Sequence, residues 1–231
     1  KNPVANPRMS AGQAEISEKG SIETKTPAVY EESRDMDEYE VKTMGTLRTR
    51  FSGKDRAISD TYALQFVRGY RSEKNPEEVT VERFSEMLGA RKKYGIDKIL
   101  DERPEFWEEF NSVRKLGVLG HTREGRPVFY ERLGMLEPQE ANKLGFDNFF
   151  AGHIRMQEEM RVLKESMSTK IGQRMYKHIV VLDMNGFGMK HMSPDVVSKL
   201  RKFMSFDNYM YPESLKHLFI VNAPWIFRTA W

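Results

Sequence analysis

The C-terminal part of the chain constrains its fold more than any other segment. Residues 179–182 and 217–221 are two short apolar segments, and Ser193-Pro194 opens a helix-like segment between them. A short apolar run without alternation is typical of a strand that is covered on both faces, as in a parallel sheet. The order strand, helix, strand therefore predicts a right-handed parallel crossover between two buried strands.

The helix in this unit has an apolar stripe that we expect to be buried. Its members recur at helical spacing after the Ser-Pro start, which is typical of an amphipathic helix packed on a core. The stripe consists of Val196, Val197, Leu200, Phe203 and Met204.

The middle of the chain adds a strand and a long helix. Residues 125–134 begin and end with glycine, and the side chains between the glycines alternate between two faces. This pattern predicts a turn, a strand and a second turn. Residues 149–175 have a helical apolar period. Such a Met-rich stripe indicates either an adaptable core or a flexible wall for an apolar ligand. Its members are Met156, Met160, Leu163 and Met167.

Helix signals dominate the preceding part of the chain. Tyr62 and Phe66 follow Ser59 at helical spacing, and Asn75-Pro76 has the form of a helix start. A third helical segment follows Pro104. These segments predict a lobe built only of helices.

The patterns divide the chain into three parts. We predict a disordered tail over residues 1–43, because residues 1–29 contain no aromatic side chain and cannot bury enough apolar area to offset the ordering entropy. Residues 44–116 form the helical lobe, and residues 117–231 form an α/β domain. The predicted fold class is therefore α/β, with a mostly parallel β-sheet as a floor, helices around it and an all-helical N-terminal lobe.

Composition excludes several classes of function. The chain has 37 basic and 34 acidic residues and a net charge of +3, without the basic stripe of a nucleic-acid-binding protein. It has no cysteine, which excludes disulfides and fits a reducing compartment. No apolar run approaches the ~20 residues of a membrane span. We expect a cytoplasmic protein, and the start at Lys1 indicates a piece of a longer chain.

Candidate catalytic patterns are incomplete. Gly186-Phe-Gly188 follows a predicted strand like part of a dinucleotide fingerprint, but His191 stands at the third glycine position, so we interpret this segment as a loop. The histidines have no metal-ligand spacing. Asp183 ends a strand and could act as an acid, although we favour hydrogen bonding within the Asp-Met-Asn-Gly turn. We therefore predict no catalytic residue, no metal and no cofactor.

Three blocks of the sequence, at residues 125–134, 181–186 and 211–227, are distinctive when taken together. They resemble the CRAL-TRIO family, which includes the phosphatidylinositol and α-tocopherol transfer proteins. The likeness covers roughly residues 55–231. It implies an apolar cavity with a parallel sheet as its floor and a mobile gate helix as its lid. Such a cavity has a physical reason, since an exposed C16 acyl chain costs on the order of 10 kcal/mol in water.

The resemblance also implies which side chains meet a lipid. The strand positions that should face the ligand are Phe129, His178, Val180, Leu182, Leu218 and Ile220. For a headgroup it implies Arg71 in the helical lobe and Glu213 in the Tyr-Pro-Glu block. Tyr70 stands where phosphoinositide-binding members have a second basic residue. His178 and Val180 stand where the yeast-type exchanger has hydroxyl side chains.

The family continues after the Asn-Ala-Pro turn with its gate helix, whereas this chain ends at Trp231. We therefore expect the α/β domain to be incomplete, to expose part of its floor and to bind lipid poorly as a fragment.

Two hypotheses for function remain, with a third ranked last. The first is non-enzymatic binding and transfer or sensing of a hydrophobic lipid between membranes, by a protein that docks transiently on a membrane surface and binds no nucleic acid. The ligand would be a phospholipid, a phosphoinositide or a lipophilic small molecule. The alternative is a membrane-recruitment or scaffold module that binds lipid or protein partners without transfer. A nucleotide-dependent enzyme ranks last, because its phosphate loop is incomplete.

Overall fold

The structure, a computed structural model, describes residues 29–52 and 58–225. Its α-helices are α1 (Glu38–Arg50), α2 (Asp60–Gly69), α3 (Pro76–Lys93), α4 (Trp107–Val113), α5 (Pro138–Leu144), α6 (Phe146–Ile171) and α7 (Pro194–Met210). Its strands are β1 (Leu116–His121), β2 (Pro127–Glu131), β3 (His178–Asp183) and β4 (Leu215–Val221). Short 3-10 turns are η1 (Glu31–Ser33), η2 (Ile96–Lys98), η3 (Leu133–Met135) and η4 (Met189–Met192).

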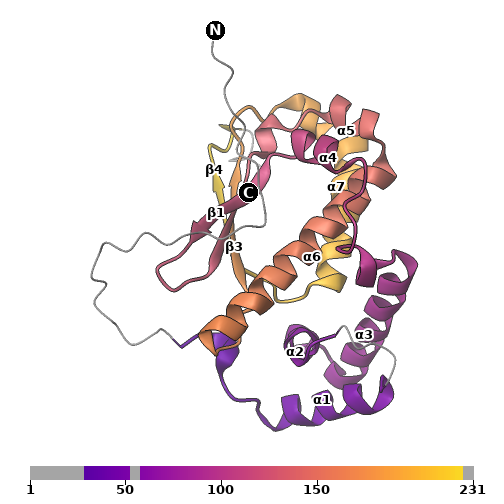
Figure 1. The fold of residues 1–231 in the computed structure, drawn as a ribbon, viewed down its shortest axis with the longest axis vertical. Helices are drawn as coiled ribbons and strands as arrows, with labels where there is room; N and C mark the ends of the chain where they lie inside the picture. Colours follow the sequence, from indigo (N-terminus) through magenta and orange to yellow (C-terminus); the bar gives the residue numbers. More distant parts are fainter. Residues whose placement is uncertain (1–28, 53–57, 226–231) are drawn as a thin grey trace.

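The four strands form one sheet in the order β1-β2-β3-β4. β2, β3 and β4 are parallel, and β3 and β4 are joined through α7, which confirms the predicted crossover. β1 pairs antiparallel with β2 and was not predicted, because Gly117 and Gly120 interrupt its apolar pattern. The pairing is irregular between Val118 and Gly120. Figure 1 shows the sheet on the left and α6 running diagonally from its lower end.

The N-terminal region is helical, as the sequence predicts, although its first helix begins at Glu38, six residues before the predicted start of the lobe. Ser59 caps α2 by accepting a hydrogen bond from the Tyr62 backbone N–H at 3.1 Å. Tyr62 and Phe66 are fully buried in one apolar cluster with residues of α1 and α3. The end of α7 enters the same cluster through Met210 and Tyr211, so the lobe and the α/β part share a core.

The predicted disordered tail is wrong for its last part. Within residues 29–43, η1 and the first turns of α1 are formed, and the Glu32 side chain is buried. The Glu32 carboxylate binds the Arg126 guanidinium, and Asp37 caps α1 by accepting from the Glu40 N–H at 3.0 Å. Ion pairs act here together with the buried Tyr30 ring, which lies just beyond the residues without an aromatic side chain from which the tail was predicted. Residues 1–28 lie outside the described residues.

The long helix α6 confirms the predicted helical period, although it begins and ends slightly earlier. Gly172 ends it in the left-handed region at φ 67°. Near its start, the Phe110 ring packs onto Gly152 so closely that a Cβ atom there would lie 2.5 Å from a ring carbon. The short helix α5 before it was not predicted.

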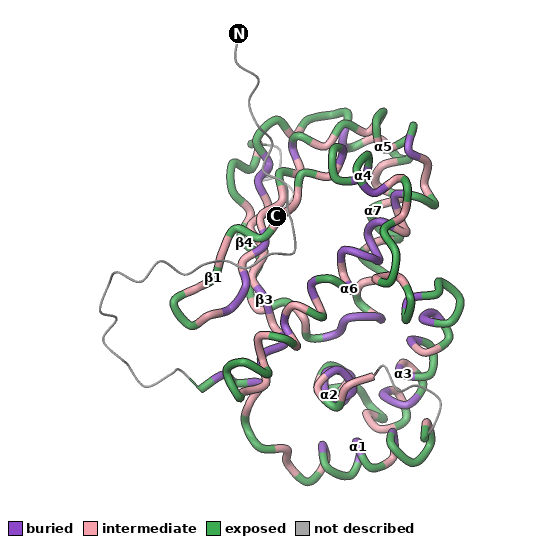
Figure 2. Tube along the Cα trace, viewed as in Figure 1, coloured by how far each residue is buried: buried purple, intermediate pink, exposed green. Residues whose placement is uncertain are grey.

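Two predicted burial patterns are wrong. β4 was expected to be covered, but Leu218 and Phe219 are 47% and 52% exposed. On α7, Leu200 and Met204 are 46% and 56% exposed, whereas Phe206 of the same helix is buried. β4 is an edge strand of the described sheet, and α7 turns a different side toward the clusters. Figure 2 shows buried stretches on α2, α3 and α6, whereas the edge strand β4 has no buried residue.

Candidate functional site

The strand side chains named from the sequence share one face of the sheet. Phe129 of β2 pairs with Val180 of β3, which pairs with Leu218 of β4. Leu182 pairs with Ile220 in the same way. Paired residues of adjacent strands point to the same face, and alternate residues along a strand share that face. We call this set the inner face: Phe129, His178, Val180, Leu182, Leu218 and Ile220.

Helix α6 lies over the inner face. At one end, the Lys164 amine lies 3.1 Å from Nδ1 of His178. At the other end, Glu131, which pairs with Leu182 in the register, reaches α6 through Arg114. The sheet and α6 are thus joined at two separate points, and both contacts start from the same face.

Burial varies across the inner face. Phe129 and His178 are buried, and their rings meet at a centroid distance of 5.2 Å. Val180 and Ile220 are half-buried, and Leu218 is exposed. The inner face is therefore closed beside the Lys164 contact and open at β4.

A polar network fixes α7 beside α6. Arg114 donates to both carboxylate oxygens of Glu131 at 3.0 and 3.2 Å, and a further Arg114 N–H meets Nδ1 of His153. Nδ1 therefore accepts, and the opposite ring nitrogen, Nε2, donates to Asp207 of α7 at 2.7 Å. The network spans β2, α6 and α7, so it sets how both helices stand against the sheet. No local sequence pattern predicts this network, because its members are far apart in the chain.

The exposed apolar residues of α7 share a side of that helix with the network. Leu200 lies seven residues before Asp207, and Met204 lies three residues before it, which are spacings of one helical face. Asp207 faces α6 through His153. Leu200, Met204 and Leu218 are thus large apolar side chains that the described residues leave uncovered.

The two expected headgroup residues lie at the same end of the molecule. A Cβ atom on Gly69 would lie 3.5 Å from Cγ of Glu213, so the end of α2 packs against the Tyr-Pro-Glu turn. Arg71 follows two residues later, but its guanidinium binds the Asp37 carboxylate. Glu213 binds the Lys177 amine at 2.8 Å. Each expected headgroup side chain thus already has a protein partner.

Asp183 has the role in a turn that the sequence favours. Its carboxylate accepts hydrogen bonds from the Tyr130 hydroxyl, the Asn222 amide at 2.8 Å and the Asn185 backbone N–H at 2.9 Å. These bonds, led by that of Tyr130, lower the pKa of Asp183 to about 2. Each acceptor position is directed at structural partners, which leaves Asp183 to hold the ends of β3 and β4 together.

The glycine-containing loop after β3 has a structural role as well. His191 is buried, and its Nε2 lies 2.8 Å from the Leu136 carbonyl oxygen. A side chain thus occupies the place where a dinucleotide fingerprint needs a glycine. Among the described residues no cluster of histidine and acidic side chains could hold a metal ion. No helix in the described ranges is long and apolar enough to cross a bilayer.

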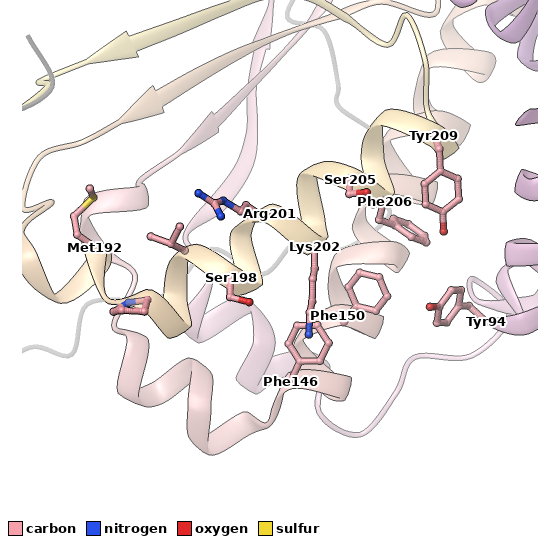
Figure 3. Close-up of a pocket in the computed structure, with 12 residues that line it drawn as sticks. Tyr94, Phe146, Phe150, Met192, Ser198, Arg201, Lys202, Ser205, Phe206 and Tyr209 are labelled. Carbon is pink, nitrogen blue, oxygen red and sulfur yellow. The ribbon is translucent and has the colours of Figure 1, made fainter. Parts of the chain in front are cut away.

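A groove of about 820 Å³ lies along α7, and none of the inner-face residues lines it. It runs between α7, the start of α6 and the end of α3. Figure 3 shows Lys202 reaching toward Phe146 on one wall, with Tyr94 and Tyr209 at one end. The Lys202 amine lies 5.0 Å from the centroid of the Phe146 ring.

Comparison with known proteins shows to which family the chain is similar. Residues 111–231 match the family described as the CRAL/TRIO domain. Two similar curated proteins are phosphatidylinositol/phosphatidylcholine transfer proteins of Arabidopsis thaliana. SFH13 is 34% identical over 151 residues, which cover 63% of this chain and 24% of SFH13. SFH14 is 31% identical over 202 residues, which cover 84% of this chain and 34% of SFH14. The chain thus spans about a third or less of these relatives.

A solved structure supports the fold independently. The crystal structure of Sfh5 superposes with a TM-score of 0.63 at 15% sequence identity, covering 85% of this chain and 75% of that one. The match includes the helical N-terminal lobe and the mostly parallel sheet, as the sequence predicts. The chain belongs to the CRAL/TRIO domain family.

Proposed function

We propose that this chain binds a hydrophobic lipid against the inner face of its sheet and transfers it between membranes without chemical change. The observation that carries the proposal is the shared face of the six strand side chains, which lies opposite α6. The transfer proteins of Arabidopsis named above support it, because their names state transfer of phosphatidylinositol and phosphatidylcholine. The same proposal includes a cytoplasmic protein that docks transiently on membranes.

The exposed apolar side chains support a ligand at this place. Leu200 and Met204 of α7 and Leu218 of β4 are each close to half exposed. An acyl chain gains roughly 0.8 kcal/mol for each CH₂ group removed from water. A lipid along the inner face would cover these side chains and its own chain together, which favours loading.

We further propose a headgroup contact at the end of α2. Glu213 lies beside Gly69, Arg71 follows Gly69 by two residues, and both would meet a phosphoinositide there once Arg71 leaves Asp37. A Glu213→Gln variant is expected to weaken loading of phosphatidylinositol and to leave phosphatidylcholine unchanged. An equal loss for both lipids would assign Glu213 a role in folding instead.

The experiment that tests the function is transfer of fluorescent lipid between vesicles by the intact protein. A carrier moves self-quenched phosphatidylinositol or phosphatidylcholine from donor to acceptor vesicles at a rate that rises with protein concentration. A scaffold module binds the donor vesicles and leaves the fluorescence unchanged. Binding without transfer would overturn the carrier in favour of the scaffold, and neither binding nor transfer would overturn both.

A further inference from the structure

Lys164 is buried in the apolar stripe of α6. Its side chain is 4% exposed, whereas lysine is almost never fully buried without a partner of opposite charge. It follows Met160 by four residues and therefore points from the same side of the helix. Its amine lies 3.1 Å from Nδ1 of His178, the first residue of the inner face on β3. The sequence pattern does not predict the burial of Lys164, because a lysine within a helix is normally assigned to the solvent-exposed side.

The partner of this amine does not neutralise it. Within the described residues Lys164 makes no ion pair with a carboxylate. Burial, followed by the positive charge of Arg161, lowers the pKa of Lys164 to about 7. Burial and the neighbouring Lys164 lower the pKa of His178 to about 2. The imidazole therefore stays neutral and can accept only one of the three N–H groups of an ammonium ion.

The other charged groups around Lys164 have their own partners. Glu158 binds Arg161 at 2.9 Å, and Glu165 binds Arg161 at 2.8 Å. Glu32 binds Arg126. These carboxylates act on the Lys164 amine only through space. Two donor positions of the amine therefore lack an acceptor in the described part of the chain, which is costly for a buried cation.

We propose that Lys164 and His178 anchor the acidic group of an amphipathic lipid, a carboxylate or a phosphate monoester, whose acyl part lies along Val180 and Leu182. This inference rests on the proposed function and specifies its substrate class. A terminal anion supplies both the missing acceptors and the missing charge. Phosphatidylcholine carries its anionic phosphodiester next to a choline cation, and that cation supplies no acceptor and is repelled by the ammonium. The pair thus favours acidic lipids over phosphatidylcholine.

The test compares loading of acidic and zwitterionic lipid. The intact protein is incubated with phosphatidylcholine vesicles that contain oleic acid or dioleoylphosphatidic acid, re-isolated and analysed by mass spectrometry for bound lipid. We expect the acidic lipid to be enriched over its share in the vesicle. In Lys164→Met the enrichment falls about 10-fold, the size expected for loss of a charge-assisted hydrogen bond. Lys170→Met is the control, since Lys170 is an exposed lysine of the same helix.

Each outcome has a stated meaning. Enrichment of either acidic lipid that Lys164→Met removes supports the anchor, and the lipid that is retained identifies carboxylate or phosphate as the source. Equal enrichment in Lys164→Met, or phosphatidylcholine as the main bound lipid, overturns it while the lipid-binding function stands. A wild-type protein that retains no lipid overturns the function itself.

A second measurement uses only the wild-type protein, so it tests the anchor even if Lys164→Met fails to fold. The protein is produced with ¹³C- and ¹⁵N-labelled lysine, and the NMR signal of the Lys164 side chain is titrated with and without oleic acid. Contact with the carboxylate of oleic acid raises the pKa of the amine above its value in the protein without oleic acid. An unchanged titration with oleic acid bound would overturn the anchor.

Discussion

The Arg91 guanidinium of α3 lies 3.2 Å from the Glu158 carboxylate of α6, and both side chains are withdrawn from solvent. Arg161 binds the same carboxylate at 2.9 Å, and the Tyr211 hydroxyl donates to it at 2.9 Å. One carboxylate thus joins the helical lobe, the long helix and the turn before β4. Since Arg91 and Glu158 are buried and Arg161 is only slightly exposed, these charges depend on each other for balance.

Replacing Glu158 should therefore destabilise the fold strongly. Glu158→Gln leaves Arg91 and Arg161 with one negative charge fewer between them, and we expect the free energy of unfolding to fall by about 3–5 kcal/mol. Urea denaturation measures the change. Glu159→Gln is the matched control, because the carboxylate of Glu159 pairs with Arg155 and is 44% exposed, so the loss should stay below about 1 kcal/mol. Similar losses for the two variants would contradict this assignment.

The contact between Gly152 and Phe110 predicts a second stability effect. In Gly152→Ala the new methyl group would lie 2.5 Å from the Phe110 ring, so α4 and α6 must separate. We expect a loss of about 1–3 kcal/mol in thermal or urea denaturation. Gly89→Ala in α3 is the matched control, because nothing lies within 4 Å of its Cβ position. There the helix preference of alanine should raise stability by up to about 1 kcal/mol, and a gain at both sites would refute the close contact.

Lys164 makes stability depend on pH in the alkaline range. The pKa of Lys164 is about 7 in the folded chain, against 10.5 for a free lysine side chain, so between these values the unfolded chain holds a proton that the folded chain has lost. The contribution of Lys164 to the free energy of unfolding therefore rises with pH across this window. We expect Lys164→Met to gain stability relative to wild type at pH 7 and to lose that advantage toward pH 10.

The matched control for this pH series is Lys170→Met, measured by urea denaturation at the same pH values. Lys170 is exposed, so its curve should run parallel to that of wild type. Parallel curves for both variants would show that Lys164 is solvated in the folded protein.

The unit of β3, α7 and β4 could be predicted from the sequence because the interactions that form each of these elements lie within a few residues. The apolar run at β3 and the Ser193 cap of α7 act within a few residues, and the cap is present at 3.4 Å. Asp183 is predicted correctly for the same reason, since its turn partner Asn185 is two residues away. Local signals therefore suffice for element type and for turn chemistry.

Long-range polar pairing lies beyond such signals. Glu32 and Arg126 are 94 residues apart, and His153 and Asp207 are 54 residues apart. No local pattern pairs these residues, so the ordered segment before α1 and the network above the inner face were missed. The exposure of Leu200 and Leu218 escaped prediction because amphipathic spacing identifies an apolar side and does not show what covers it.

The central claim is that the inner face of the sheet binds the lipid, and two neighbouring residues of β4 test it most directly. Ile220 belongs to the inner face, whereas the adjacent Phe219 points to the other face and is 52% exposed. The intact protein and its Ile220→Glu and Phe219→Glu variants are incubated with mixed phospholipid vesicles, checked for folding by circular dichroism and analysed for bound lipid by mass spectrometry. We predict that Ile220→Glu folds but carries no lipid, and that Phe219→Glu retains lipid as wild type does. Full loading of Ile220→Glu, or loss of lipid in Phe219→Glu alone, would contradict the inner face as the lipid site.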